Sequence, residues 1–215
     1  SEGYGIFSES GQGTVFMMNP ISADKWYIYF LIVNLLGFML NVMKTKVFYR
    51  RKSSFFDKVS MAVSLIGGAA GTALAIALTD RKITKENVWL RIWTICILLI
   101  QIFVFLLLKM SSGRTISFNI WGFFKEHRGI FYYLAILNVI TFAVYGIDKY
   151  LAVKNKHRIK IVTLLGLSLL GGSIGGLAAV YFFRHKTKKK YFTAGIPLMI
   201  VMQICILLFL INWKG

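Results

Sequence analysis

Acidic residues are scarce in this chain, which has 8 Asp and Glu against 26 Lys and Arg among 215 residues and a formal net charge of +18. This shortage argues against a paired-carboxylate active site. Cys96 and Cys205 each lie inside an apolar run, so they predict no disulfide framework, redox pair or zinc site. The sequence also has no His-Glu-x-x-His pair or Walker loop. We therefore expect no enzyme, cofactor or metal.

Apolar residues, by contrast, make up 57% of the chain, and the mean hydropathy is +0.65. They gather in runs that approach the roughly 20 residues needed by a transmembrane helix. The predicted spans are residues 27–43, 59–79, 92–108, 129–147, 159–183 and 194–213. The sequence therefore predicts an all-α, polytopic membrane protein with six transmembrane helices. Residues 1–26 are expected to form a polar tail, and they do not resemble a secretory signal.

An internal repeat relates the two halves at a constant shift of 104 residues. Asn34 aligns with Asn138, and a GG-x-x-G run aligns with a second one without a gap. We interpret residues 27–108 and 129–215 as two three-helix repeats joined by an interfacial linker, residues 109–128. Three spans per copy would turn the second copy over, so the sequence predicts a 3+3 inverted-topology repeat, an arrangement common in transporters.

Lys and Arg are concentrated in the connectors between spans. We expect membrane lipids, mainly anionic ones, as their partners. We expect no nucleic acid, because the basic residues do not form one soluble basic face. A homo-oligomer or a membrane protein partner stays open. In the inverted arrangement residues 44–58, 109–128 and 184–190 share one side, which holds 15 of the 26 Lys and Arg and is predicted to be cytoplasmic.

Four motifs follow one another in the second half: Tyr145-Gly146-Ile147-Asp148-Lys149, Arg158-Ile159, the glycine-rich run 171–175, and FRHKTKKKYFTAGIP from Phe183 to Pro197. Together they cover residues 130–210, and this segment resembles the domain of unknown function 1294 family of small bacterial membrane proteins. The resemblance implies a bacterial cytoplasmic membrane location and no particular activity. Typical members are single three-helix units, so we interpret this chain as a tandem duplication.

Departures from the family pattern are divided between the halves. Members usually carry Glu three residues after the Arg of the Arg-Ile pair, where this chain has Ile161, and the equivalent position of the first half is Asp57. Conversely, Lys44-Thr45 occupies the place of Asp148-Lys149. We interpret the halves as having lost complementary pieces, so that they form one composite unit.

Ionisable residues near the span ends are candidate sites, because charges at membrane depth are usually paired or functional. We predict cross-repeat salt bridges of Asp57 with Arg184 or His185, and of Asp80 with Arg158, at the level of Asp148. Pinning of helix ends is the first interpretation, and contact with a substrate or ion is the alternative. The candidate substrate or lipid contacts are Arg184, His185, Lys186, Lys149 and Arg158, whose alternative role is to anchor the topology.

Glycines in spans two and five are predicted to let those spans cross closely. They are Gly67, Gly68, Gly71, Gly171, Gly172 and Gly175. Helix packing is the first interpretation, and a narrow pathway lined by exposed backbone is the alternative. Asn34, Asn138, Ser64 and Ser168 are expected first to make interhelical hydrogen bonds.

These features lead to two hypotheses for function. The leading hypothesis is a small inverted-repeat transporter or channel for an anionic solute or a phosphate-bearing lipid, supported by the predicted topology and the basic charge. The alternative is a non-transporting scaffold or accessory subunit that binds partner helices and anionic lipid.

Overall fold

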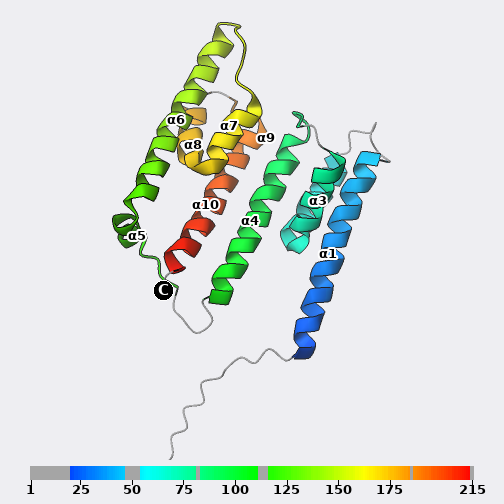
Figure 1. The fold of residues 1–215 in the computed structure, drawn as a ribbon. Coiled ribbons are helices and arrows are strands. Elements are labelled where there is room, and N and C mark those ends of the chain that lie inside the picture. The colour runs from blue at the N-terminus through cyan, green and yellow to red at the C-terminus, as the bar shows by residue number, and fades with distance from the viewer. Residues whose placement is uncertain (1–19, 47–53, 81–82, 111–115, 185, 214–215) are drawn as a thin grey trace, which may run out of the picture.

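The computed structural model describes residues 20–46, 54–80, 83–110, 116–184 and 186–213, and all regular structure in these ranges is helical (Figure 1). The N-terminal half contains α1 (Pro20–Lys46), α2 (Ser54–Val63), the π-helical turn η1 (Ser64–Gly68), α3 (Ala69–Thr79) and α4 (Val88–Met110). The C-terminal half contains α5 (Ile120–Glu126), α6 (Arg128–Val153), α7 (Ile161–Leu167), the π-helical turn η2 (Ser168–Gly172), α8 (Ser173–Phe182), α9 (Lys190–Thr193) and α10 (Gly195–Asn212). By length and composition, six helical stretches can cross a membrane, which indicates a multi-pass membrane protein.

The second apolar stretch of the N-terminal half is broken at its centre. Gly67 has a φ of +117°, which L side chains rarely adopt, and it closes α2 in the turn η1. Before this turn, α2 runs antiparallel to α1. Asp57, near the start of α2, pairs with Lys44, near the end of α1, whereas the Gly67 carbonyl accepts a hydrogen bond from Asn34, ten residues earlier on α1.

After the turn, the chain goes back along α1 in the opposite direction. Gly71 lies against Asn34, and Thr72 lies against Gly37, so α3 runs parallel to α1. Asp80, just beyond α3, then pairs with Arg91 in the first turn of α4. Helices α2 and α3 therefore form a helical hairpin that begins and ends beside the C-terminal end of α1.

The C-terminal half contains a second hairpin, made of α7 and α8. Gly171, with a φ of +136°, is its reversal point. Before the reversal, the backbone N–H of Ile159 donates to Asp148 near the end of α6. After it, the contacts proceed in parallel along α6 and α8: Asn138 with Gly175, Gly146 with Phe183, and Asp148 with Lys186.

This geometry contradicts the inverted-topology prediction. Each half consists of one long helix, a hairpin that returns to its starting side, and a second long helix, so both halves have the same orientation. Figure 1 shows α1 and α6 rising to the end at which α4 and α10 begin. The arms are short: the 11 residues of α3 are about 16 Å long, roughly half of a 30 Å hydrocarbon layer.

The corrected topology places most of the basic side chains at one end, which we call the basic end: it is where α1, α3, α6 and α8 finish and α2, α4, α7 and α10 begin. The opposite end is where α1 and α6 begin and α4 and α10 finish. Of the Lys and Arg side chains that the structure describes, those at the basic end are Lys44, Lys58, Lys85, Arg91, Lys149, Lys154, Lys156, Arg158, Lys160, Arg184, Lys186, Lys188, Lys189 and Lys190, and those at the opposite end are Lys25, Lys109, Lys125 and Arg128.

A helix break inside an apolar layer leaves backbone N–H and carbonyl groups without partners in the helix. Nearby side chains form hydrogen bonds with these groups instead. The Asn34 amide donates to the Gly67 carbonyl at 3.0 Å and accepts from the Gly71 N–H at 2.7 Å. Tyr29 donates to the Ile66 carbonyl at 2.7 Å. From α4, Gln101 donates to the Ser64 carbonyl at 2.7 Å.

The second break has the same set of bonds. Asn138 donates to the Gly171 carbonyl at 3.0 Å and accepts from the Gly175 N–H at 2.6 Å. Tyr133 donates to the Leu170 carbonyl, and Gln203 of α10 donates to the Ser168 carbonyl at 2.8 Å. The predicted interhelical bonds of the two asparagines are therefore confirmed. The Ser64 hydroxyl instead bonds back to the Ser60 carbonyl. The Ser168 hydroxyl bonds back to the Leu164 carbonyl and also lies 3.1 Å from the Tyr145 hydroxyl of α6, so its predicted interhelical bond is confirmed.

The glycines pack within each half, so the predicted crossing of spans two and five at these residues is wrong. A Cβ on Gly68 would lie 2.8 Å from the Val33 carbonyl oxygen of α1, and one on Gly71 would overlap the Asn34 backbone. In the C-terminal half a Cβ on Gly172 would overlap Thr141 of α6, and one on Gly175 would overlap the Asn138 backbone. These residues do pack closely, and each hairpin packs on the long helix that precedes it.

The halves meet along α4 and α10. Gly195 at the start of α10 faces Trp89 and Ile92 at the start of α4, and the rings of Phe103 and Phe209 lie 5.2 Å apart toward the opposite end. Buried residues of α4, α6, α7, α8 and α10 form one hydrophobic cluster. The connector before α5, within the predicted linker, bonds to Asn212 through both backbone groups of Ser117.

The topology can be tested with single cysteines at Lys125, Lys156 and Lys188, in a protein whose Cys96 and Cys205 are replaced. Membrane-impermeant labelling should modify positions 156 and 188 from one side and position 125 from the other, because α7 and α8 return to the basic end. Labelling of positions 125 and 188 from the same side, with 156 opposite, would instead support the inverted topology.

Substitution of Asn138 by Leu should destabilise the folded protein by about 2–4 kcal/mol, because it leaves the Gly171 carbonyl and the Gly175 N–H without partners in an apolar setting. Thermal unfolding in detergent measures the effect. Asn34→Leu should act similarly, and Val139→Leu, at a position with 70% exposure, is the matched control. Equal unfolding temperatures for Asn138→Leu and the control would contradict this role.

Candidate functional site

A buried carboxylate organises the basic end of the C-terminal half. The Asp148 side chain is 1% exposed and lies 2.5 Å from the Lys186 ammonium group, and it also accepts the backbone N–H of Ile159 at 3.1 Å. It thus joins the end of α6, the segment leading into α7 and the segment that follows α8. A carboxylate at this depth requires such compensation, because an unpaired buried charge is strongly destabilising.

The segment that carries Lys186 has an unusual backbone. Arg184 and Lys186 have φ values of +44° and +62°, in the left-handed region that non-glycine residues seldom occupy. The ion pair with Asp148 holds Lys186 in place, and its ammonium group also lies 5.0 Å from the centre of the Phe192 ring. Residues in such conformations often cluster at ligand sites and persist where the surroundings fix them.

A basic pocket of about 500 Å³ lies beside this ion pair, between the two halves. The segment before α4 contributes Thr84 and Lys85, and the C-terminal half contributes the segment before α7 and the residues around α9. Five cationic side chains line the pocket: Lys85, Arg158, Lys160, Lys186 and Lys189. Its other lining residues are Ile83, Thr84, Val88, Ile159, Ile161, Val162 and Tyr191, so the described lining includes no carboxylate.

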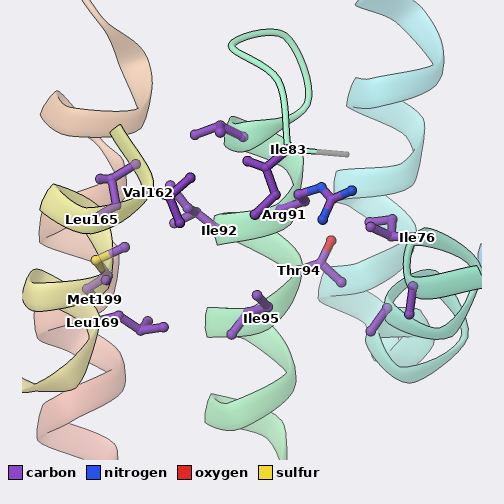
Figure 2. A pocket seen from close by; sticks show the side chains of 14 residues that line it. Ile76, Ile83, Arg91, Ile92, Thr94, Ile95, Val162, Leu165, Leu169 and Met199 are labelled. Atoms are coloured by element: carbon purple, nitrogen blue, oxygen red, sulfur yellow. The ribbon is translucent and has the colours of Figure 1, made fainter. Parts of the chain in front are cut away.

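An apolar pocket of about 360 Å³ adjoins the basic pocket and shares Ile83, Val88 and Val162 with it. It lies across α4, between α3 and the pair α7 and α10 (Figure 2). Its remaining lining residues are Ala73, Ile76, Ala77, Arg91, Ile92, Thr94, Ile95, Leu165, Gly166, Leu169 and Met199. The two pockets together form a site that is basic at one end and mainly hydrocarbon at the other.

Two polar side chains interrupt the apolar pocket, and both come from α4. Arg91 and Thr94 are three residues apart and therefore share a face of the helix. Arg91 donates to the backbone carbonyl of Asp80 and pairs with its carboxylate. Thr94 is 1% exposed, and within the described part of the chain its hydroxyl has no hydrogen-bond partner.

Of the five candidate contacts predicted from sequence, Arg158 and Lys186 line the basic pocket. Arg184 is exposed and Lys149 half-buried, and neither lines it. His185 falls outside the described residues. Lys85 and Lys160 were missed, because they belong to unremarkable basic connectors. Lys189 belongs to the basic run 184–190, and only the corrected topology brings that run to the face that carries Lys85 and Lys160.

The predicted cross-repeat salt bridges have other partners. Asp57 pairs with Lys44, because α2 begins beside the end of α1. Asp80 pairs with Arg91 and accepts from the Asn87 amide at 2.8 Å, because α4 begins where α3 ends. Arg184 and Arg158 were the predicted partners, together with His185, which the structure does not describe. Within the described residues, no group of three or more His, Cys, Asp or Glu could hold a metal ion.

Replacing Asp148 by Asn should destabilise the protein by about 3 kcal/mol or more, because it removes the carboxylate that pairs with the charge of Lys186. Asp57→Asn, which breaks a pair whose side chains are 24% and 31% exposed, should cost about 1 kcal/mol or less. Thermal unfolding of both variants in the same detergent gives the comparison. An Asp148→Asn variant no less stable than Asp57→Asn would contradict the structural role of this ion pair.

Comparison with known proteins agrees with the resemblance seen in the sequence. A family model described as "Protein of unknown function (DUF1294)" matches residues 138–192, which include Asp148, Arg158 and Lys186. The uncharacterized protein YsdA of Bacillus subtilis (strain 168) is 38% identical over 71 residues, covering 33% of this chain and 80% of that relative. No solved structure matches. The chain belongs to the DUF1294 family, whose function is unknown.

Proposed function

We propose that this protein binds a phosphate-bearing anion in the basic pocket at the junction of its two halves. The observation that carries the proposal is the convergence of Lys85, Arg158, Lys160, Lys186 and Lys189 on one cavity, with no carboxylate among its described lining residues. Lys186 is already paired with Asp148, but the other four cations repel one another, so an anion that neutralises them would stabilise the arrangement.

The chemistry of the lining favours phosphate over a weakly charged ligand. Arg158 offers a planar fork of donors that fits two phosphate oxygens, and the lysines act as compact point charges. Phosphates on lipids and on solutes share this chemistry. The proposal therefore concerns the anionic group, whichever molecule carries it.

We also propose that the halves are tandem copies in the same orientation. The support is the recurrence of the break-capping bonds: Tyr29, Asn34 and their acceptors recur 104 residues later, and Gln101 recurs as Gln203. A family whose typical members are single units would then build the pocket from two subunits. In this chain, Lys85 comes from the first copy and the other four cations from the second.

The orientation in the membrane follows from the charge distribution as a further part of the proposal. Among described side chains, 14 Lys and Arg lie at the basic end and 4 at the opposite end. Because cytoplasmic connectors carry the excess of Lys and Arg, we place the basic end in the cytoplasm of a bacterial cell. The ligand would then be reached from the cytoplasmic side or from the inner leaflet.

Transport is no part of this proposal. The hypothesis of an inverted-repeat transporter drew its support from two oppositely oriented copies, and the hairpins remove that support. Binding of a phosphate group needs only the pocket. Recognition of an anionic solute or a phosphate-bearing lipid, which the sequence hypotheses also include, is still supported by the basic pocket.

The test compares two double variants that lose equal charge at the basic end. Arg158→Gln with Lys189→Gln alters the pocket, whereas Lys154→Gln with Lys188→Gln alters exposed positions outside its lining. Binding of dioleoyl phosphatidate and of glycerol 3-phosphate is measured by native mass spectrometry of the purified protein. The first variant should bind about tenfold or more weakly, since each cation near an anionic group contributes about 1 kcal/mol and direct hydrogen bonds add to it.

The control variant should keep wild-type affinity, and binding should weaken as salt is raised. Equal losses in both double variants would mean that general surface charge, and not the pocket, holds the anion. Absence of binding by either probe to the wild-type protein would refute the proposed function itself.

A further inference from the structure

We propose that the phosphate belongs to an acyl glycerophospholipid, with its phosphate in the basic pocket and one acyl chain in the apolar pocket across α4. This inference rests on the proposed function, which it narrows from any phosphate to one class of amphiphile. The evidence comes from the second pocket, which a soluble anion would not use.

The two pockets adjoin each other and are opposite in character. They share Ile83, Val88 and Val162, so a ligand held by the lysines has hydrocarbon surface directly beneath it. A free phosphate or sugar phosphate would leave about 360 Å³ of apolar cavity unfilled. A lipid fills both parts, because its acyl chain can contact the apolar lining while its phosphate contacts the cations.

The apolar pocket is accessible from the surroundings of the protein. Ile83 and Val162 are 48% exposed and Ile95 is 42% exposed, and all three line the pocket. In a membrane protein such apolar positions face lipid. An acyl chain can therefore enter sideways from the bilayer while the phosphate stays at the basic end.

The polar side chains on α4 indicate the kind of linkage that joins the phosphate of the ligand to its acyl chain. Arg91 and Thr94 lie three and six residues beyond the shared rim residue Val88, or about 5 and 9 Å along the helix axis. The Thr94 hydroxyl is buried and, in the part of the chain that the structure describes, without a hydrogen-bond partner. Buried hydroxyls are normally satisfied, so a ligand oxygen that reached Thr94 would supply the partner that its hydroxyl lacks.

Ester linkages provide such an oxygen, because they lie a few bonds below the phosphate of a glycerolipid. A prenyl phosphate has no oxygen in this region and would leave Thr94 unsatisfied. The order of groups along the site is therefore cationic, then polar, then apolar, and an acyl glycerophospholipid has the same order.

A glycine offers a clean way to close the apolar pocket. Gly166 lies on α7 and lines the cavity, and a Cβ built on it meets no atom within 4 Å. Leu at this position should fill the pocket without displacing neighbours, and it removes a flexible residue from a helix. Gly129, on α6 at the opposite end, has equally open surroundings and provides the matched control as Gly129→Leu.

The experiment measures binding of three probes to purified wild-type protein and variants by native mass spectrometry: oleoyl lysophosphatidate, glycerol 3-phosphate and farnesyl phosphate. Wild-type protein should bind lysophosphatidate at least tenfold more tightly than either of the others. Gly166→Leu should lower lysophosphatidate affinity toward that of glycerol 3-phosphate, while Gly129→Leu leaves it unchanged. Thr94→Val should lower the affinity for lysophosphatidate about fivefold and leave the affinity for farnesyl phosphate unchanged.

The outcomes separate this inference from the proposed function. Equal affinities for lysophosphatidate and glycerol 3-phosphate, or full lysophosphatidate affinity in Gly166→Leu, would overturn the lipid assignment and leave phosphate binding in place. If farnesyl phosphate binds as tightly as lysophosphatidate, the inference that the ligand carries an ester linkage is overturned. If no probe binds the wild-type protein, the proposed function and the inference fail together.

Discussion

The structure depends on the pairing of backbone polar groups where two helices break inside an apolar layer. A helix end leaves several carbonyls and N–H groups without partners, and lipid offers none in return. In this protein Asn34 and Asn138 each bond to both sides of a break, donating to the glycine carbonyl and accepting the N–H four residues later. With tyrosine and glutamine side chains covering further carbonyls, a hairpin becomes tolerable at membrane depth.

The site at the basic end follows from these hairpins. Because α2–α3 and α7–α8 return to the side from which they start, the described residues that precede α4, α7 and α10 all lie at the basic end. Lys85 thereby comes to face Arg158 and Lys189 across one pocket, although 73 residues separate Lys85 from Arg158 in the sequence. Had the α7–α8 stretch crossed the membrane, Lys189 would lie on the face opposite to Lys85 and Arg158. The ion pair of Asp148 with Lys186 fixes the part of this end where α6, α7 and α8 meet.

The sequence predicted the apolar stretches, the importance of Asn34 and Asn138, and the family of the C-terminal half. It did not predict the reversals, because a stretch such as 55–79 is long and apolar enough to be a straight span, and a GG-x-x-G run is equally consistent with close helix packing. The left-handed backbone of Gly67 and Gly171 distinguishes the two cases, and it cannot be inferred from composition. The missed reversals also affected the predicted membrane orientation. In the inverted topology the basic residues divide almost evenly between the two faces, whereas with the hairpins most of them lie on one face. Thr94 gave no signal in the sequence, because a lone threonine in an apolar helix is ordinary.

Pulsed electron spin resonance on the second hairpin tests the central claim most directly. Spin labels at Thr163 and Phe182, two exposed positions at the ends of α7 and α8, would be about 28 Å apart along a continuous helix. The hairpin predicts a separation well below that, about half or less, in protein reconstituted into lipid. A single distribution near 28 Å would show that the stretch crosses the membrane, and it would remove the basis for the composite pocket.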